Sequence, residues 1–254
     1  YNSLHILKTD GTVWSAGSAT VGQLGNGSST GQMAVFVPAL NGGSILQNIS
    51  KLYVGEDHSG TTVAAVTSTG TLYMWGGNTW GQMGTNDTTL RSSAYLPIGA
   101  FQGKVAKVVF GGQFSGSGNN TTYILTTDGD VYSSGANARG ATGQGIVGTC
   151  VAASAAGCNQ VFQKVIRNSD GYKVVDLRTY GFHNGANTTP YYTTVMLLLE
   201  NGTLMTAGDN TFGQAGNDVN TIQYNSTFKF VTGFGPGDKQ AAVGLSTLVP
   251  ISQL

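Results

Sequence analysis

Charged side chains are scarce in this sequence: they make up 9% of its 254 residues, against an average of about 25% in soluble domains. The 12 basic residues balance the 12 acidic ones, so the formal net charge is zero. A surface that binds nucleic acid needs clustered Lys and Arg to neutralise phosphates. We therefore expect no nucleic-acid partner.

Long apolar runs are also missing. A membrane-spanning helix needs about 18 or more consecutive apolar residues, whereas the densest run here, residues 195–199, has the length of a strand. We expect no membrane span. The chain begins at Tyr1 and the last repeat described below is cut short, so we expect it to be part of a larger protein.

Cysteine is nearly absent, with Cys150 and Cys158 the two examples. Two cysteines without a nearby histidine lack the number and spacing of ligands that a zinc site needs, so we expect no metal. The pair predicts a small loop closed by a disulfide if the compartment is oxidising, and two free thiols otherwise. We favour the disulfide.

Glycine, by contrast, is abundant, and it recurs in a pattern. A nine-residue corner reads Gly76-x-Asn78-x-x-Gly81-Gln82-x-Gly84, and Gly208, Asn210, Gly213, Gln214 and Gly216 repeat it in full. Two looser copies start at Gly17 and Gly135, with Ala19 in place of Asn and Ala141 in place of Gln. A polar turn, such as Asp10-Gly11, and a short apolar strand precede each corner.

Self-similarity at this length indicates an array of one supersecondary unit, because one unit cannot bury both of its apolar faces. In the second unit we expect strands at 63–67, 72–75, 95–98 and 105–110, which would form one antiparallel blade. Four-stranded blades around a channel make a β-propeller. The sequence thus predicts an all-β propeller with repeats at 1–54, 55–110, 111–180 and 181–243, and residues 244–254 starting or closing a blade.

The polar turn, the aromatic strand and the corner resemble the repeat of the regulator of chromosome condensation family. The match extends upstream to Gly55-Glu56-Asp57-His58-Ser59, which is similar to the start of that family's repeat. The resemblance covers nearly the whole chain and implies propellers of about seven blades that bind proteins, among them nucleotide-exchange factors and a propeller-type β-lactamase inhibitor.

The corner residues themselves are interpreted as structural. Glycines three apart permit a tight reversal with positive φ, and Asn or Gln amides can bind loop backbone groups. A phosphate-binding loop is disfavoured, because no Gly-Lys-Ser/Thr motif or helix follows the glycines.

Inserted loops are the candidate contact surfaces, since insertions at equivalent points of a repeat array emerge on one face. The binding candidates are Trp80, Phe182, His183, Tyr191, Tyr192 and Phe212. For Trp80 and Phe212 we favour a simple lid over the blade, and for the insertion at 181–192 a harmless change of loop length is equally consistent.

No catalytic motif or cofactor motif is present in the sequence, so we expect no catalytic residues and no cofactor. The preferred hypothesis is a non-catalytic binding or structural propeller, displayed on a virion or cell surface, that contacts a receptor, a glycan or a neighbouring subunit. The alternative is a soluble regulator, such as a GTPase exchange factor or an enzyme inhibitor. An enzyme acting on a polysaccharide is a third hypothesis.

Overall fold

The structure is a computed structural model. It describes residues 2–57, 60–111, 120–145, 147, 158–165, 167, 171–181, 193–217, 223–233, 240–242 and 248–250. In this part of the chain the secondary structure is strands and one turn of 3-10 helix, so the expected all-β class is confirmed.

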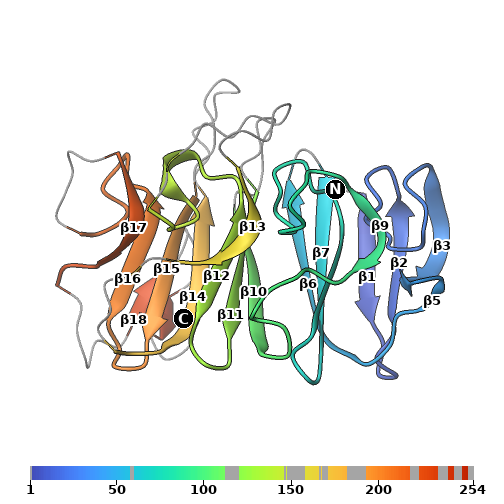
Figure 1. Cartoon of the computed structure of the whole chain (residues 1–254), viewed down its shortest axis with the longest axis horizontal. Helices are drawn as coiled ribbons and strands as arrows, with labels where there is room; N and C mark the ends of the chain where they lie inside the picture. The colour runs from blue at the N-terminus through green and yellow to red at the C-terminus, as the bar shows by residue number, and fades with distance from the viewer. Residues whose placement is uncertain are drawn as a thin grey trace.

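Four antiparallel sheets follow one another along the chain (Figure 1). The first contains β1 (Ser3–Leu7), β2 (Val13–Ser18) and β3 (Gln32–Pro38), and the second β6 (Ile49–Asp57), β7 (Gly60–Thr67), β8 (Leu72–Gly76) and β9 (Arg91–Tyr95). The third contains β10 (Val105–Gly111), β11 (Thr121–Thr126), β12 (Val131–Gly135) and β13 (Asn159–Lys164), with η1 (Ala138–Gly140) after β12. The fourth contains β14 (Val174–Gly181), β15 (Thr193–Leu199), β16 (Leu204–Asp209) and β17 (Tyr224–Phe230).

Two short hairpins complete the described strands. One joins β4 (Leu40–Asn41) to β5 (Ser44–Ile45), and the other joins β18 (Gln240–Ala242) to β19 (Leu248–Pro250).

The sheets are offset from the expected blade by one strand. Residues 105–110, expected as the fourth strand of the second blade, lie in β10 and pair with β11 of the third sheet. That grouping was wrong, because a repeat period fixes the spacing of strands but not the strand at which a sheet begins. The third strand also differs, since β9 ends at Tyr95, where the expected strand began.

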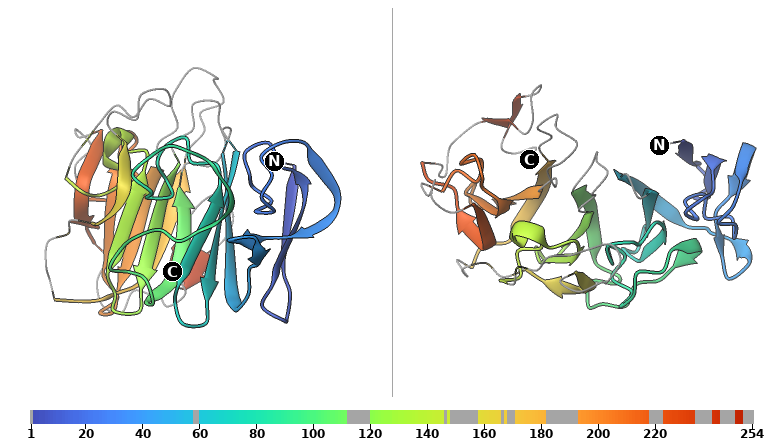
Figure 2. Two further views of the ribbon diagram at one scale, coloured as in Figure 1. Left: turned by 45° about the vertical axis from the view of Figure 1, so that its right-hand side comes forward. Right: turned by 90° about the horizontal axis from the view of Figure 1, so that it is seen from above.

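Seen from above, the sheets form an arc, with β6, β10 and β14 along its inner side (Figure 2). These first strands of successive sheets contact one another. The last strands, β9, β13 and β17, lie toward the convex side.

Apolar side chains fill the space between neighbouring sheets. Between the first and second sheets the core contains Val13, Ala39, Val63, Ala65 and Trp75. Similar clusters lie between the second and third sheets and between the third and fourth. Each inner sheet therefore buries both faces, as expected of a repeat that cannot fold alone.

The hairpin turns at the lower end of the sheets in Figure 1 explain the Asp-Gly and Asn-Gly pairs. Asp10 Oδ1 accepts hydrogen bonds from the backbone N–H of Thr12 at 3.0 Å and from its hydroxyl at 2.6 Å. These bonds, together with the Lys8 ammonium, lower the pKa of Asp10 to about 2. Asn201 makes the same pair of bonds to Thr203 in the fourth sheet. The amide thus substitutes for the carboxylate without loss of the turn.

Candidate functional site

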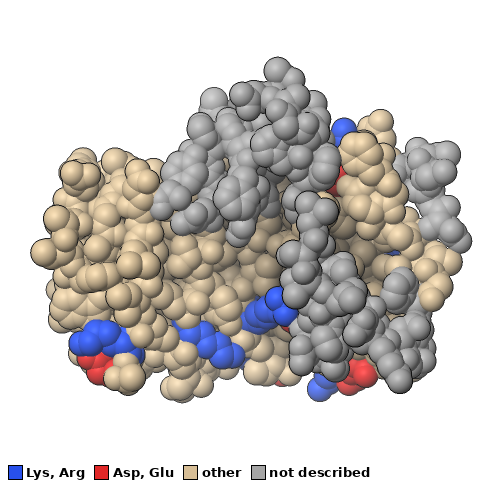
Figure 3. All heavy atoms as spheres, turned by 180° about the vertical axis from the view of Figure 1, so that it is seen from behind, with Lys and Arg blue, Asp and Glu red and all other residues tan. Residues whose placement is uncertain are grey.

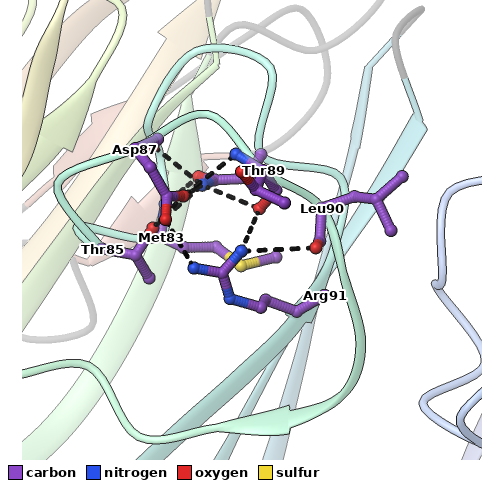
Figure 4. A network of polar contacts seen from close by, with 7 residues as sticks. Met83, Thr85, Asp87, Thr89, Leu90 and Arg91 are labelled. Atoms are coloured by element: carbon purple, nitrogen blue, oxygen red, sulfur yellow. Dashed lines mark hydrogen bonds and ion pairs between the residues drawn. The ribbon is translucent and has the colours of Figure 1, made fainter.

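The corner of the second repeat is held by the buried amide of Asn78, which is 1% exposed. Its Oδ1 accepts from the backbone N–H of Met83 at 2.9 Å. Its Nδ2 donates to the hydroxyl of Thr85 at 3.0 Å and to the carbonyls of Asp87 at 3.0 Å and Thr89 at 3.2 Å. Figure 4 shows this network with the labelled loop residues around it. One side chain therefore binds both sides of a loop that no strand ladder reaches.

A carboxylate reinforces this loop. Asp87 Oδ2 forms an ion pair with Arg91 at 2.7 Å, and its Oδ1 accepts from the Thr85 hydroxyl at 2.9 Å and the Thr89 N–H at 3.0 Å (Figure 4). Burial alone raises the pKa of Asp87, but the hydrogen bonds from Arg91, Thr85 and Thr89 outweigh it and lower the pKa below its ordinary value. Asp87 is thus a structural anion, charged at neutral pH.

The glutamine of the motif has a second, distinct role. Gln82 Oε1 accepts from the Trp80 N–H at 2.9 Å, while its Nε2 donates to the Gly77 carbonyl at 3.0 Å. In the fourth corner, Gln214 accepts from the Phe212 N–H at 2.8 Å, and Asn210 accepts from the Ala215 N–H at 2.9 Å. The two full copies of the motif therefore share the contacts of their amide oxygens, whereas Gln214 Nε2 donates to the Asp209 carboxylate in place of a backbone carbonyl.

Each corner glycine lies in the left-handed region of φ. The values are +98° at Gly76, +71° at Gly81 and +66° at Gly84, and +97°, +77° and +62° at Gly208, Gly213 and Gly216. In the second corner the glycines also permit close approach: a Cβ on Gly84 would lie 2.2 Å from Phe162 of the third sheet. The corner is thus also a docking point between sheets.

The residues expected to bind a partner differ in their exposure to solvent. Trp80 is 6% exposed and packs with Ala136 and Cys158 of the third sheet region, so it does not offer its ring to solvent. Phe212 is 72% exposed. The loop candidates Phe182, His183, Tyr191 and Tyr192 lie outside the described residues.

Cys158 is disulfide-bonded. Its expected partner, Cys150, lies outside the described residues. His5 is bound between hydroxyls, with Ser15 Oγ at 2.9 Å from Nδ1 and Ser3 Oγ at 3.1 Å from Nε2. This position suits a structural histidine of the first hairpin.

A surface that the sequence did not single out runs along the inner side of the arc. We call it the inner row: Lys51 on β6, Lys107 on β10 and Arg178 on β14, at neighbouring places on three successive first strands. Lys51 Nζ donates to the Ala106 carbonyl at 2.7 Å, and Lys107 Nζ donates to Asp176 at 2.5 Å. Figure 3 shows this hollowed side of the molecule, where Lys and Arg gather toward the lower margin and the rest of the described surface has few charges.

Sequence reasoning could have found part of the inner row, because Lys51 and Lys107 stand at equivalent distances before Gly55 and Gly111. Arg178 has no counterpart in the other repeats. Within the described residues, no group of three His, Cys, Asp or Glu side chains is placed to hold a metal ion, and no helix there has the length and apolar character to cross a membrane.

Antiparallel sheets stacked radially along an arc define the class of this protein as a β-propeller. Residues 69–117 match the Regulator of chromosome condensation (RCC1) repeat. The match to this repeat and the propeller fold together support the RCC1-repeat β-propeller that the sequence predicted.

Curated relatives include the X-linked retinitis pigmentosa GTPase regulator of Homo sapiens, which is 30% identical over 165 residues, or 65% of this chain and 13% of that protein. The Mus musculus protein of the same name is 31% identical over the same shares. This chain thus corresponds to a small part of these relatives.

Solved structures with the same fold include yeast RCC1 (Prp20) bound to Kap60, with 15% identity and a TM-score of 0.63, and human WBSCR16, with 18% identity and a TM-score of 0.55. The likeness covers 91% of this chain in both cases, and 47% and 51% of the solved chains. This chain spans about half the length of those structures.

Proposed function

We propose that this propeller is a non-catalytic, protein-binding module of a regulator, and that the inner row binds an acidic surface of its partner. The observation that carries the proposal is the gathering of Lys51, Lys107 and Arg178 on three adjacent first strands of a chain in which only 9% of residues are charged. The names of the curated relatives, GTPase regulators, support a regulatory role.

Asp176 neutralises part of the charge of the inner row. Lys107 is paired with Asp176, and its side chain is 26% exposed. The Arg178 side chain is 43% exposed and lies 3.6 Å from the same carboxylate, while Lys51 is exposed. The three cations outnumber the Asp176 carboxylate, and this excess of positive charge favours an acidic partner by steering its approach and fixing its orientation.

A small GTPase is the partner class we would test first. The assay is calorimetric titration of the purified chain with a panel of small GTPases at low and at high salt. We expect Lys51→Glu and Arg178→Glu each to weaken binding about tenfold or more, and salt to weaken the wild-type complex. Lys229→Glu on β17, an exposed lysine of the convex side, is the matched control and should bind like the wild type.

Binding that survives both inner-row substitutions would reject this surface. Failure of the wild type to bind any GTPase would reject the partner class. Activity of the purified chain against a panel of polysaccharides would contradict the non-catalytic assignment.

Display on a virion or cell surface is a second candidate, supported by the disulfide at Cys158, because such bonds persist in oxidising compartments. The partner would then be a receptor, a glycan or a neighbouring subunit. Antibody labelling of intact, unpermeabilised particles or cells tests it. Labelling only after permeabilisation would dismiss display.

A further inference from the structure

Asparagine followed by glycine is a chemically labile step in a peptide chain, because glycine has no side chain to shield its backbone nitrogen or restrict its backbone. That nitrogen can attack the side-chain amide carbon of the preceding asparagine. The described part of the chain contains three such steps, Asn26-Gly27, Asn41-Gly42 and Asn201-Gly202. A fourth, Asn184-Gly185, lies outside the described residues. The three described steps have different surroundings.

The step in the first corner is held by the neighbouring sheet. Gly27 N donates to the Ser92 carbonyl at 2.7 Å. Asn26 Oδ1 accepts from the Ser28 N–H at 3.1 Å, and Asn26 also forms a β-bridge with Ser93. Attack by Gly27 N on the Asn26 amide therefore requires these contacts to break first, and the fold protects this asparagine.

The step in the fourth sheet is held in a hairpin turn. Gly202 N donates to the Leu199 carbonyl at 2.9 Å. Asn201 Oδ1 accepts from the backbone N–H of Thr203 at 3.1 Å and from its hydroxyl at 2.7 Å. The strands on either side of the turn, β15 and β16, are almost entirely buried. The nucleophile and the amide that it would attack are thus both occupied, and opening the turn would disturb buried strands.

The third step lies at the tip of the β4–β5 hairpin, and β5 lies at the margin of the molecule in Figure 1. Asn41 pairs with Ser44, so Gly42 and Gly43 form the turn, with φ of +56° and +86°. Within the described residues, Gly42 N has no hydrogen-bond acceptor and the Asn41 side chain has no hydrogen-bond partner. All four residues are exposed. Neither the nucleophile nor the amide is occupied here.

This hairpin can also open at small cost. Its ladder has two residue pairs, and short two-stranded hairpins are marginally stable in water. Its base is fixed to the first corner, because Leu40 N donates to the Gly25 carbonyl at 2.8 Å. Opening can therefore be confined to the tip, as expected of a segment with few buried contacts. The open tip can reach conformations in which Gly42 N approaches the Asn41 amide.

We propose that Asn41 is a site of spontaneous deamidation, a modification that the fold suppresses at Asn26 and Asn201. Gly42 N loses its proton to a base in solution and bonds to Cγ of Asn41, while the side-chain nitrogen takes up a proton and leaves as ammonia. The product is a cyclic succinimide. Water then breaks one of the two ring bonds to the Gly42 nitrogen, which gives either aspartate or isoaspartate at position 41. The reaction consumes only water.

The modification changes both charge and backbone. A carboxylate replaces a neutral amide in a chain whose formal net charge is zero, so the product is an acidic variant of the protein. Isoaspartate also adds a methylene group to the backbone between residues 41 and 42, which lengthens the turn between the paired residues Asn41 and Ser44. β4 contacts β9 of the second sheet. The altered hairpin therefore lies against a neighbouring sheet.

Peptide mapping of the purified, folded protein after incubation at mildly alkaline pH tests the proposal. Digestion with chymotrypsin, which cuts after Phe36, separates Asn26 from Asn41, and tandem mass spectrometry identifies each modified residue. We expect deamidation at Asn41 to be at least about tenfold faster than at Asn26 or Asn201, because attack at those two sites requires hydrogen bonds to break first. In concentrated urea, where the fold is lost, the three sites should react at similar rates.

Asn41→Gln is the matched variant, because it keeps an exposed amide but places the amide carbon one bond too far for ready ring closure. Its chymotryptic peptide around position 41 should stay unmodified. Incubation with a protein-isoaspartate methyltransferase and labelled S-adenosylmethionine should label this peptide in the aged wild type and not in Asn41→Gln. Circular dichroism checks that the variant is folded.

Two results would overturn the proposal. The first is a folded protein in which Asn41 stays intact or reacts no faster than Asn26 and Asn201. The second is an advantage of Asn41 that is equally large in urea, since the selectivity would then come from the local sequence and not from the fold.

Discussion

Replacing Asn78 by Ala tests whether the corner amide holds the repeat together. The change leaves the Met83 N–H, 2.9 Å from Asn78 Oδ1, without its acceptor, and removes the donor to the carbonyls of Asp87 and Thr89. Met83 is fully buried, whereas Thr89 is exposed and can bind water instead. A buried orphaned group costs about 1–3 kcal/mol. Counting Met83 and the half-buried Asp87 carbonyl, we expect a loss of about 3 kcal/mol in the free energy of unfolding.

The assay is urea unfolding followed by tryptophan fluorescence, with linear extrapolation to water. Asn41→Ala, an exposed amide on the β4–β5 hairpin, is the control and should stay within about 0.5 kcal/mol of the wild type. Asn78→Asp should cost more than Asn78→Ala, because a carboxylate oxygen would face two carbonyl oxygens. A loss below about 1 kcal/mol for Asn78→Ala would refute the reasoning, since the loop would then be held by its other contacts.

Two further substitutions test the glycines and the ion pair of the corners. Gly84→Ala should cost several kcal/mol more than Gly103→Ala, because both have positive φ but the added Cβ meets Phe162 at 2.2 Å in the first case and nothing within 4 Å in the second; equal losses in thermal unfolding would contradict the docking role. Asp87→Asn should cost about 1 kcal/mol at neutral pH, since the Asp87 side chain is 40% exposed. The folded-state pKa of Asp87 is lowered, so this stabilisation is present above its ordinary value of 3.8 and is lost as pH falls through the lowered pKa. Wild type and Asp87→Asn should therefore converge in acid, and a constant gap would refute the assignment.

The repeat and the fold class could be predicted from the sequence because backbone positions with positive φ select glycine, and these glycines recur at fixed spacing. Gly76 and Gly208 each adopt φ near +100° at a strand end, which other residues rarely do. The sequence could not show at which strand each sheet begins. A strand such as β10 has the same apolar pattern whether it pairs with the strand before it or with the strand after it in the chain. Only the long-range ladder with β11 decides it.

Exposure of the corner aromatics could not be predicted either. Trp80 and Phe212 occupy the same place in identical motifs, yet they are 6% and 72% exposed. The difference arises from the third sheet, which packs on Trp80, and not from anything near either residue in the sequence. The inner row was missed for a related reason: its three cations lie far apart in the chain and come together only when the first strands converge.

Low charge has a structural cause in this fold, and it need not indicate where the protein functions. Each inner sheet buries both faces against its neighbours, and the corners use neutral amides such as Asn78 and Gln82, which are both 1% exposed. Burying a charge costs far more than burying a hydrogen-bonded amide. The few charged side chains are often paired with one another, as Lys8 and Asp10 are at 3.0 Å in a hairpin turn and Asp87 and Arg91 are at 2.7 Å in a corner. Because sheet stacking alone can produce a composition this poor in charge, the composition gives little support to display outside a cell. The exposed cations of the inner row are the more informative sign of a partner.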